Sequence, residues 1–591
     1  MLIIIASWIY ILTIAYCLGA AFHAGLQKVF RAPALALHFS LNGITGLMVL
    51  TFICMSLCLF MPLGLASNLL ILLITIGASW LARKDLRAAL AADWSRLKQG
   101  NPIVSLIFLA FILIISRMSY EPSSHFDDGL YYSTTIRWLQ EYGTVKGLAN
   151  INARIGFNSS WHILQANFGF RFLNAGLFND LNGLLFLLML LYSIGGINDL
   201  LKGDSGWRTA LRAFIMLPVL AFHFKATSDL MLFNINFLGS TTADIPACLL
   251  IWLIFLLFLT PTNGKQGREA TSLEASPLGA VPLTDILVVL YSAWACTIKF
   301  SAAPIFLLSA CLVYRLMVAR RFQPIAGLAI GCLLMVTPWV TRNVLISGYL
   351  LFPFSAVDIF HVRWKLPINE VRGHENAIKA FALGAPVYRQ FTTPIIVWFP
   401  KWAAGLDFIR QVILGTVFLA TICYFFTGVY LIFKKGAIIF STYLREIVAV
   451  ITGIAGIFFW LDKAPDFRFG YGFLIIYCML FLVLACRYGL QQQSRYLVYP
   501  AILYMSVLAI FHYQRVWEQR DIFFAPPLPY RMPEAMTKVS SPDGKIFYIV
   551  TKSDSWNGPL PIVNDFEYRQ IKPAYMGSRI EDGFMSTEQQ P

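Results

Sequence analysis

Two adjacent carboxylates, Asp127 and Asp128, follow an apolar run at 103–115. They belong to the stretch Ser-Ser-His-Phe-Asp-Asp-Gly-Leu-Tyr-Tyr at 123–132. Carboxylates at a membrane surface can take a proton from an attacking hydroxyl group, or hold a divalent cation such as Mg²⁺ or Mn²⁺ that neutralises a departing phosphate. Asp-Asp-Gly before an amphipathic segment is also typical of a helix N-cap. The two acids alone therefore leave catalysis and capping open.

The residues around this pair have the side-chain types of a sugar-binding pocket. Tyrosine and tryptophan offer flat faces that stack on sugar rings, and the stretch 150–162 is dense in hydrogen-bonding groups. The alternative for the aromatic residues is a belt at the membrane interface, which is their commoner use. The candidate substrate-binding residues of this region are His125, Tyr131, Tyr132, Arg154, Asn158, Trp161 and His162.

Cations that could bind a phosphate come from three later segments. Asp466 and Arg468 lie in the compact stretch Ala-Pro-Asp-Phe-Arg-Phe-Gly at 464–470, where a guanidinium group could hold a lipid phosphate with two hydrogen bonds. Lys299 and Arg342 interrupt or end apolar runs. Each has a plain alternative, because Asp466 and Arg468 could simply pair at a turn and a lysine can extend to the headgroups. Asp244, at a predicted helix start, is a further candidate whose plain alternative is a helix cap.

The composition of the whole chain indicates that it is embedded in a membrane. Of 591 residues, 58% are hydrophobic and 13% charged, and the mean hydropathy is +0.66. This composition is typical of an integral membrane protein. We attribute the net charge of +15 to cytoplasmic loops and not to nucleic-acid binding, since no nucleic-acid or nucleotide motif is present. The ten cysteines lie in apolar runs without metal-ligand spacing, so neither disulfides nor a zinc site is expected.

Apolar runs predict an all-α membrane protein with about fourteen spans. Basic connections follow every odd-numbered run, which predicts that these connections are cytoplasmic and that the longer, aromatic connections lie outside. The first run lacks a basic leader, so we expect it to be retained as a span. The expected divisions are N-terminal spans at 1–116, an outer catalytic loop at 117–180, central spans at 181–345, a second outer loop at 346–410, C-terminal spans at 411–512 and an outer tail at 513–591.

The tail has its own pattern. A Pro-rich stretch at 521–535 precedes an Asp-Gly turn and the run Lys-Ile-Phe-Tyr-Ile-Val at 545–550, which is typical of a strand. A second strand is predicted at 560–563. We therefore expect a small β-containing appendage on the outer face.

The acidic stretch resembles that of the GT-C superfamily, the polytopic glycosyltransferases that use polyprenyl-phosphate sugars. The segments 126–132, 157–161 and 464–470 are also similar to those of a group of bacterial membrane proteins. The resemblance implies a GT-C-like fold in the bacterial inner membrane, with the active face periplasmic. It implies transfer from a polyprenyl-phosphate-linked sugar to a glycan, lipid or protein acceptor, with Asp127 or Asp128 as the base and an inverting displacement. GT-C enzymes usually carry the acidic loop after the first helix, and here it follows about the fourth. A lipid-linked glycan flippase or other transporter, or a glycan polymerase or ligase, are the alternatives.

Overall fold

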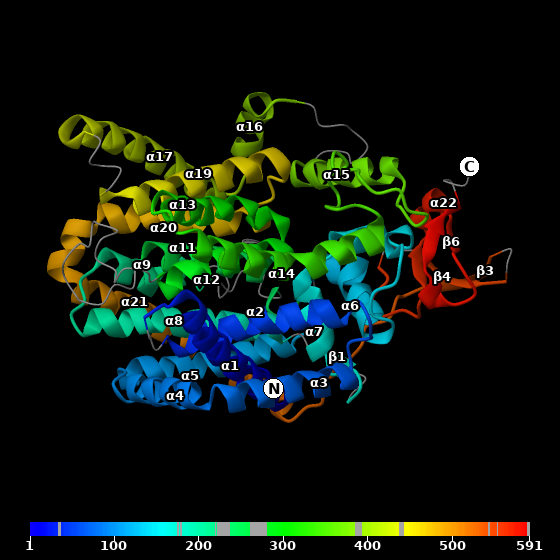
Figure 1. Cartoon of the computed structure of the whole chain (residues 1–591), viewed down its shortest axis with the longest axis horizontal. Helices are drawn as coiled ribbons and strands as arrows, with labels where there is room; N and C mark the ends of the chain where they lie inside the picture. Colours follow the sequence, from blue (N-terminus) through cyan, green and yellow to red (C-terminus); the bar gives the residue numbers. More distant parts are fainter. Residues whose placement is uncertain are drawn as a thin grey trace.

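The computed structural model shows an elongated bundle of helices with small strands at one end (Figure 1). It describes residues 1–591 except 34–36, 124, 174–175, 178–179, 219, 221–236, 261–280, 385–392, 437–441, 542–543, 552–553 and 588–591. Within these described residues the chain is mostly helical, as its apolar periodicity predicts.

Among the described residues, ten helices are long and apolar enough to cross a membrane, or eleven if the bent pair α3–α4 counts as one span. The members of that pair, α3 (Leu65–Leu81) and α4 (Arg83–Lys98), meet at 87°. The ten are α1 (Leu2–Phe30), α2 (Phe39–Leu57), α5 (Pro102–Tyr120), α8 (Leu181–Leu201), η6 with α13 (Phe300–Ile305 and Phe306–Val318), α14 (Phe322–Ser347), α17 (Phe408–Lys435), α19 (Leu444–Lys463), α20 (Phe467–Ala485) and α21 (Arg487–Glu518).

The expectation of about fourteen spans is therefore not confirmed, although a helix lies at each predicted run. Two of these helices, α11 (Asp244–Leu259) and α12 (Leu283–Ile298), have only 16 residues each, and all their residues are buried. A third, α9 (Trp207–Phe214), has eight residues, and most of the predicted outer connection at 225–242 lies outside the described part of the chain. A helix enclosed by other helices touches protein along its length and need not match the thickness of the lipid.

The spans alternate in direction, so their ends form two opposite faces. At one face Arg445, in the first turn of α19, places Nη2 2.8 Å from Oδ2 of Asp285 at the start of α12. Arg208, in the first turn of α9, pairs with Glu446 at 2.8 Å on the same face. We call this face the basic end, because the connections that open there are flanked by or contain basic residues, namely Lys28, Arg83, Arg208, Arg320 and Arg445. The acidic stretch and the segment 464–470 lie at the opposite face, the site end.

Short elements cover the site end. They are the π-helical turn η1 (Asp128–Tyr132), α6 (Ser133–Glu141), η2 (Leu148–Asn150), η3 (Ala153–Phe157), α7 (Ser160–Phe168), α15 (Ile368–Ala382), α16 (Ile395–Ala404), η7 (Arg520–Phe523), α22 (Asp565–Ile571) and η8 (Ile580–Asp582).

The expected C-terminal strands are confirmed, but they have no separate core. Strand β4 (Ile546–Val550) pairs antiparallel with β3 (Met536–Ser540) and parallel with β5 (Ile562–Asn564). Two further antiparallel pairs join β1 (Gly176–Leu177) to β2 (Leu528–Pro529) and β6 (Pro573–Tyr575) to β7 (Phe584–Ser586). The hydrophobic cluster beneath the strands mixes tail and bundle residues: Trp138, Val145, Leu148, Ile151, Ile155, Ile346, Phe547, Val563 and Phe584.

Candidate active site

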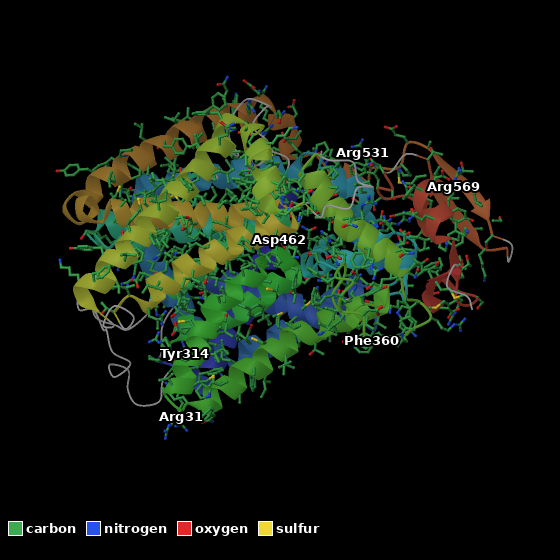
Figure 2. The ribbon with its side chains drawn as sticks, turned by 90° about the horizontal axis from the view of Figure 1, so that it is seen from above. Arg31, Tyr314, Phe360, Asp462, Arg531 and Arg569 are labelled. Atoms are coloured by element: carbon green, nitrogen blue, oxygen red, sulfur yellow. The ribbon has the colours of Figure 1, made fainter. Side chains whose placement is uncertain are left out.

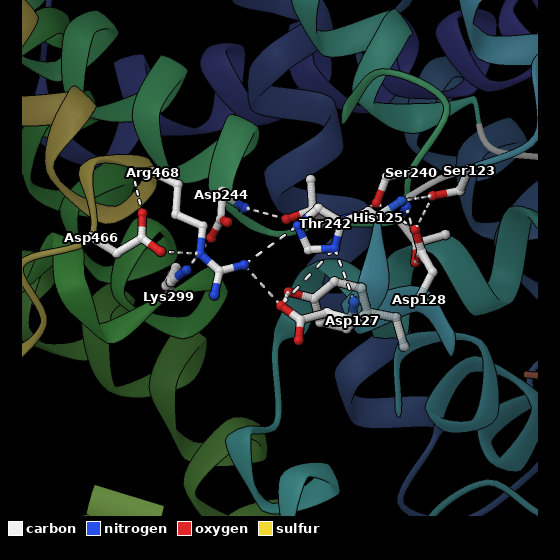
Figure 3. Close-up of polar contacts among 12 residues, drawn as sticks. Ser123, His125, Asp127, Asp128, Ser240, Thr242, Asp244, Lys299, Asp466 and Arg468 are labelled. Atoms are coloured by element: carbon white, nitrogen blue, oxygen red, sulfur yellow. Dashed lines mark hydrogen bonds and ion pairs between the residues drawn. The ribbon is translucent and has the colours of Figure 1, made fainter. Parts of the chain in front are cut away.

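An ion-pair cluster joins the acidic stretch to the start of α20 (Figure 3). Arg468 places Nη1 3.0 Å from Oδ2 of Asp127 and Nε 3.1 Å from Oδ2 of Asp466. These two aspartates come from parts of the chain more than 300 residues apart. The Arg468 and Asp127 side chains are only 14% and 12% exposed. The two segments chosen from the sequence for their charges therefore meet in one partly buried site.

Local structure explains the position of Arg468. Asp466 is the N-cap of α20, and its Oδ1 accepts a hydrogen bond from the Arg468 backbone amide at 3.1 Å. The arginine side chain then lies among aromatic rings, with Cζ 4.6 Å from the ring centre of Phe469 and 5.1 Å from that of Phe126. The cap fixes the backbone and the rings confine the guanidinium group.

Asp128 faces away from this cluster. Its carboxylate accepts hydrogen bonds from the hydroxyl groups of Ser123, Ser240 (2.6 Å) and Thr241, and from the Thr241 backbone amide at 3.2 Å. The residue is 2% exposed. Figure 3 shows Asp127 turned toward Arg468 and Asp128 toward Ser123 and Ser240. Asp128 thus ties the acidic stretch to the segment before α11, and its oxygens are already occupied by protein donors.

A second ion pair lies beside the first. Lys299, between α12 and η6, pairs through Nζ with Oδ1 of Asp244 in the first turn of α11. Its ammonium group also lies 3.6 Å from the ring centre of Phe469. The other oxygen of Asp244, Oδ2, is buried and has no hydrogen-bond partner in the described part of the chain. Lys299 is therefore fixed by a partner and is not a lysine that extends freely to the headgroups.

Aromatic rings form one wall of the site. His125 stacks on Phe126 at 5.2 Å and on Tyr132 at 5.8 Å between ring centres, and His162 packs against Tyr132 at 4.5 Å. The Tyr132 hydroxyl donates to Oδ2 of Asp127 at 3.4 Å. Burial raises the pKa of both Tyr131 and Tyr132 well above the usual value and lowers the pKa of His162 to about 3. These groups are neutral near pH 7, and the low pKa means that the His162 imidazole binds a proton too weakly to be an effective base.

Four other predicted substrate-binding residues make their contacts within the protein. Arg154 lies 3.4 Å from Glu567 of α22, and Trp161, which is fully buried, donates to Asn182 at 2.7 Å. Arg342 is 1% exposed and donates to the amide oxygen of Asn158, whose amide nitrogen donates to the Trp339 carbonyl at 3.0 Å and the Asn343 side chain at 2.6 Å. These contacts fasten the outer loop to the bundle.

The residues present do not fit a divalent cation. In the part of the chain that the structure describes, no three His, Cys, Asp or Glu side chains come together as a metal site. Asp128 is taken up by hydroxyl and amide donors, and Arg468 occupies Oδ2 of Asp127, which leaves a single open carboxylate oxygen in the pair. Among the described residues, the oxygen-rich ligand sets that Mg²⁺ and Mn²⁺ prefer are therefore not formed here.

An apolar groove of about 340 Å³ lies beside the ion pairs, between η6 and α19. It continues from Lys299, since the next residue, Phe300, packs against Phe459 in the groove wall at 6.4 Å. Figure 2 marks Asp462, the charged member of the lining, at the end of α19. The lining residues are Ala303, Pro304, Leu307, Ala455, Phe458, Phe459 and Asp462.

Asp244 has a larger role than the helix cap that its sequence position indicated. Its position at a helix start favoured a capping role, but the N-cap of α11 is Ala243, and Asp244 instead points to Lys299. The available signal was an aspartate at the start of one apolar run and a lysine at the end of the next, because antiparallel runs bring these two ends together and opposite charges at a membrane helix end pair with one another.

Fold and site define a multi-pass membrane protein with a partly buried cluster of ion pairs at one end of its bundle. The chain belongs to the family described as a domain of unknown function, DUF8201, whose model matches residues 1–475. That range includes the acidic stretch, Asp244, Lys299 and the start of α20. No curated protein and no solved structure matches the chain.

Proposed function

We propose that this protein is a membrane glycosyltransferase of the bacterial inner membrane, which moves a sugar from a polyprenyl-phosphate donor to an acceptor at its extracytoplasmic face. The observation that carries the proposal is the placement of Asp127. Its Oδ2 is held by Arg468 at 3.0 Å, and its Oδ1 has no hydrogen-bond partner among the described residues. A carboxylate with one fixed and one open oxygen is suited to take a proton from a bound hydroxyl group.

The reaction is a single displacement. Asp127 Oδ1 accepts the proton of the acceptor hydroxyl as that oxygen bonds to the anomeric carbon, and the bond from this carbon to the carrier phosphate oxygen breaks. The phosphate departs with the bonding electron pair, and the configuration of the sugar inverts. Arg468 and Lys299 are positioned to stabilise the charge that develops on the phosphate. Asp128 keeps its structural contacts throughout.

The distribution of charge supports an extracytoplasmic site. The connections rich in Lys and Arg open at the basic end, and such connections normally remain in the cytoplasm. The site end then faces the periplasm, where a polyprenyl-linked donor can be used without a soluble nucleotide sugar. Glycan, lipid and protein acceptors are all compatible with this geometry.

The apolar groove supports a lipid-linked donor. It lies between two helices that are long enough to span the membrane, and its lining begins at Ala303, four residues after Lys299. A prenyl chain in this groove would carry its phosphate to the two cations of the site. A transporter would be expected to place its ionisable residues near the membrane midplane. Here the ionisable residues gather at the helix ends, which favours sugar transfer over flipping of a lipid-linked glycan. The transfer could be that of a single-sugar transferase or that of a glycan polymerase or ligase.

The test is sugar transfer in membranes that contain the Asp127→Asn or Asp128→Asn variant. Asp127→Asn is expected to lower turnover by about 10²–10⁴-fold, the usual contribution of a general base. Asp128→Asn is expected to reduce the amount of folded protein and to leave turnover per folded molecule within a few-fold. Full activity of Asp127→Asn would remove this residue from the chemistry and with it the proposal.

A further inference from the structure

The C-terminal region, which lies beyond the family-matched residues, contacts the acidic stretch directly. The backbone amides of Ser555 and Trp556 both donate to the carbonyl oxygen of Gly129, at 2.8 and 3.0 Å. The Thr134 hydroxyl donates to the Trp556 carbonyl at 2.8 Å. Arg137, one turn further along α6, donates to the carbonyls of residues 557 and 558. Residues 555–558, which we call the clamp, therefore hold both η1 and the start of α6.

The clamp holds a backbone conformation that has little stability alone. In the π-helical turn η1 the hydrogen-bond spacing is widened to i→i+5, a rare arrangement that is frequently found at functional sites. Widening alters the hydrogen-bond pattern of the turn, and the clamp supplies two additional donors to one of its carbonyls. The clamp therefore contacts the turn η1, which begins with Asp128 and directly follows Asp127.

Close packing adds to the hydrogen bonds. Trp556 is 8% exposed, and Arg531 covers its ring with Cζ 4.2 Å from the ring centre. A Cβ atom added to Gly129 would lie 2.8 Å from the Trp556 ring, so only glycine allows this approach. The clamp is itself anchored, because strand β4 and the residues after β5 share a hydrophobic cluster with α6 and α14.

We propose that the clamp is a positioning device for the active site: residues 555–558 hold η1 so that the Asp127 carboxylate stays against Arg468 while Asp128 stays against Ser240. The C-terminal region is then a working part of the site, with Trp556 as a positioning residue that touches no substrate. The expected effect on catalysis rests on the proposed function. The structural part concerns the order of the turn and can be tested without any activity.

The structural test is hydrogen exchange on the full-length protein in detergent micelles, read by mass spectrometry. Trp556→Ala is expected to raise the exchange rate of amides in peptides that cover residues 126–137 by at least tenfold, while peptides from α20 remain unchanged. Phe566→Ala, which removes a 70% exposed ring from α22, is the matched control and is expected to change neither. Unchanged exchange at 126–137 in Trp556→Ala would overturn the proposal.

A gentler variant covers the case in which Trp556→Ala does not accumulate in the membrane. Thr134→Val removes one hydrogen bond to the clamp and keeps the side-chain volume. It is expected to give a smaller rise in exchange over the same peptides, and no rise would overturn the proposal equally. Gly129→Ala, which forces the Trp556 ring away, is expected to reproduce the effect of Trp556→Ala.

The catalytic consequence is measured separately. In the transfer assay, Trp556→Ala is expected to lower kcat at least tenfold with KM changed less than threefold, and Trp556→Phe, which keeps a flat ring and the backbone amide, is expected to restore most of kcat. A rise in KM alone, or no rescue by Trp556→Phe, would contradict a positioning role. If wild-type protein transfers no sugar, the proposed function fails while the exchange result still decides whether the clamp exists.

Discussion

The pairing of Arg468 with Asp127 makes a quantitative prediction. Arg468→Met removes the cation that contacts both Asp127 and Asp466, and the three side chains are only 14%, 12% and 25% exposed. Removing one partner of a buried ion pair costs about 3–5 kcal/mol, because the remaining charge stays buried without compensation. Since this cluster keeps some exposure, we expect a loss of about 3 kcal/mol in the free energy of unfolding.

A double-mutant cycle isolates the pair. Asp127→Asn alone should cost about 2 kcal/mol, since Asp466 remains beside Arg468, and the double variant should cost about 2 kcal/mol less than the sum of the single variants. The measurement is reversible unfolding of purified protein in mixed micelles of increasing denaturing detergent, followed by circular dichroism. Arg468→Lys keeps the charge but cannot reach both carboxylates with a planar fork, so its stability should lie between those of wild type and Arg468→Met.

An exposed ion pair in the same chain provides the control. Arg569 lies 3.0 Å from Asp565 on α22, with side chains 77% and 35% exposed. Exposed pairs contribute at most about 1 kcal/mol, so Arg569→Met should leave the unfolding curve nearly unchanged. Additive losses within about 0.5 kcal/mol for Arg468 and Asp127 would mean that the two side chains are not paired, and the site as described would be incorrect.

Further predictions concern the edges of the site. Burial raises the pKa of Glu567 to about 7 against an ordinary 4.5. Between pH 4.5 and 7 the folded protein therefore binds more protons at this carboxyl group than the unfolded chain does. The stability of the C-terminal region should fall as pH rises through this range. Glu567→Gln should remove this slope, on the order of 3 kcal/mol in total, in thermal unfolding scans at several pH values. Lys299→Met should destabilise the fold by leaving Asp244 buried without its cation, and Lys299→Met with Asp244→Asn should recover part of that loss in the same scans. Transfer by wild-type membranes should persist after treatment with a divalent-cation chelator, and a loss that Mg²⁺ or Mn²⁺ restores would show that a metal takes part.

Much of the architecture follows from local sequence, because apolar runs and basic connections act over a single helix. Helices lie at each run that hydropathy indicated, and the connections with Lys and Arg open at a common end. The length of an apolar run does not indicate whether the helix is enclosed by other helices. The fully buried α11 and α12 are shorter than ordinary spans, and only tertiary packing reveals this.

The site was predictable in part. The charges of 123–132 and 464–470 were sufficient to select both segments, and the structure brings them together. The different surroundings of Asp127 and Asp128 were not predictable, because two of the three hydroxyl groups that bind Asp128 belong to residues 240 and 241, more than 100 positions away. The dependence of the acidic stretch on residues 555–558 also arises from long-range contacts that no local pattern encodes.

Because the chain is synthesised from its N-terminus, these long sequence separations delay the formation of the site. Asp127 is synthesised early, and its partner Arg468 follows 341 residues later. Trp556, whose carbonyl accepts a hydrogen bond from Thr134, follows that threonine by 422 residues. A ribosome adds about 5–20 residues per second. The nascent protein therefore carries an incomplete ion-pair cluster for tens of seconds, and any prematurely ended product would be embedded in lipid without Arg468 or without the clamp.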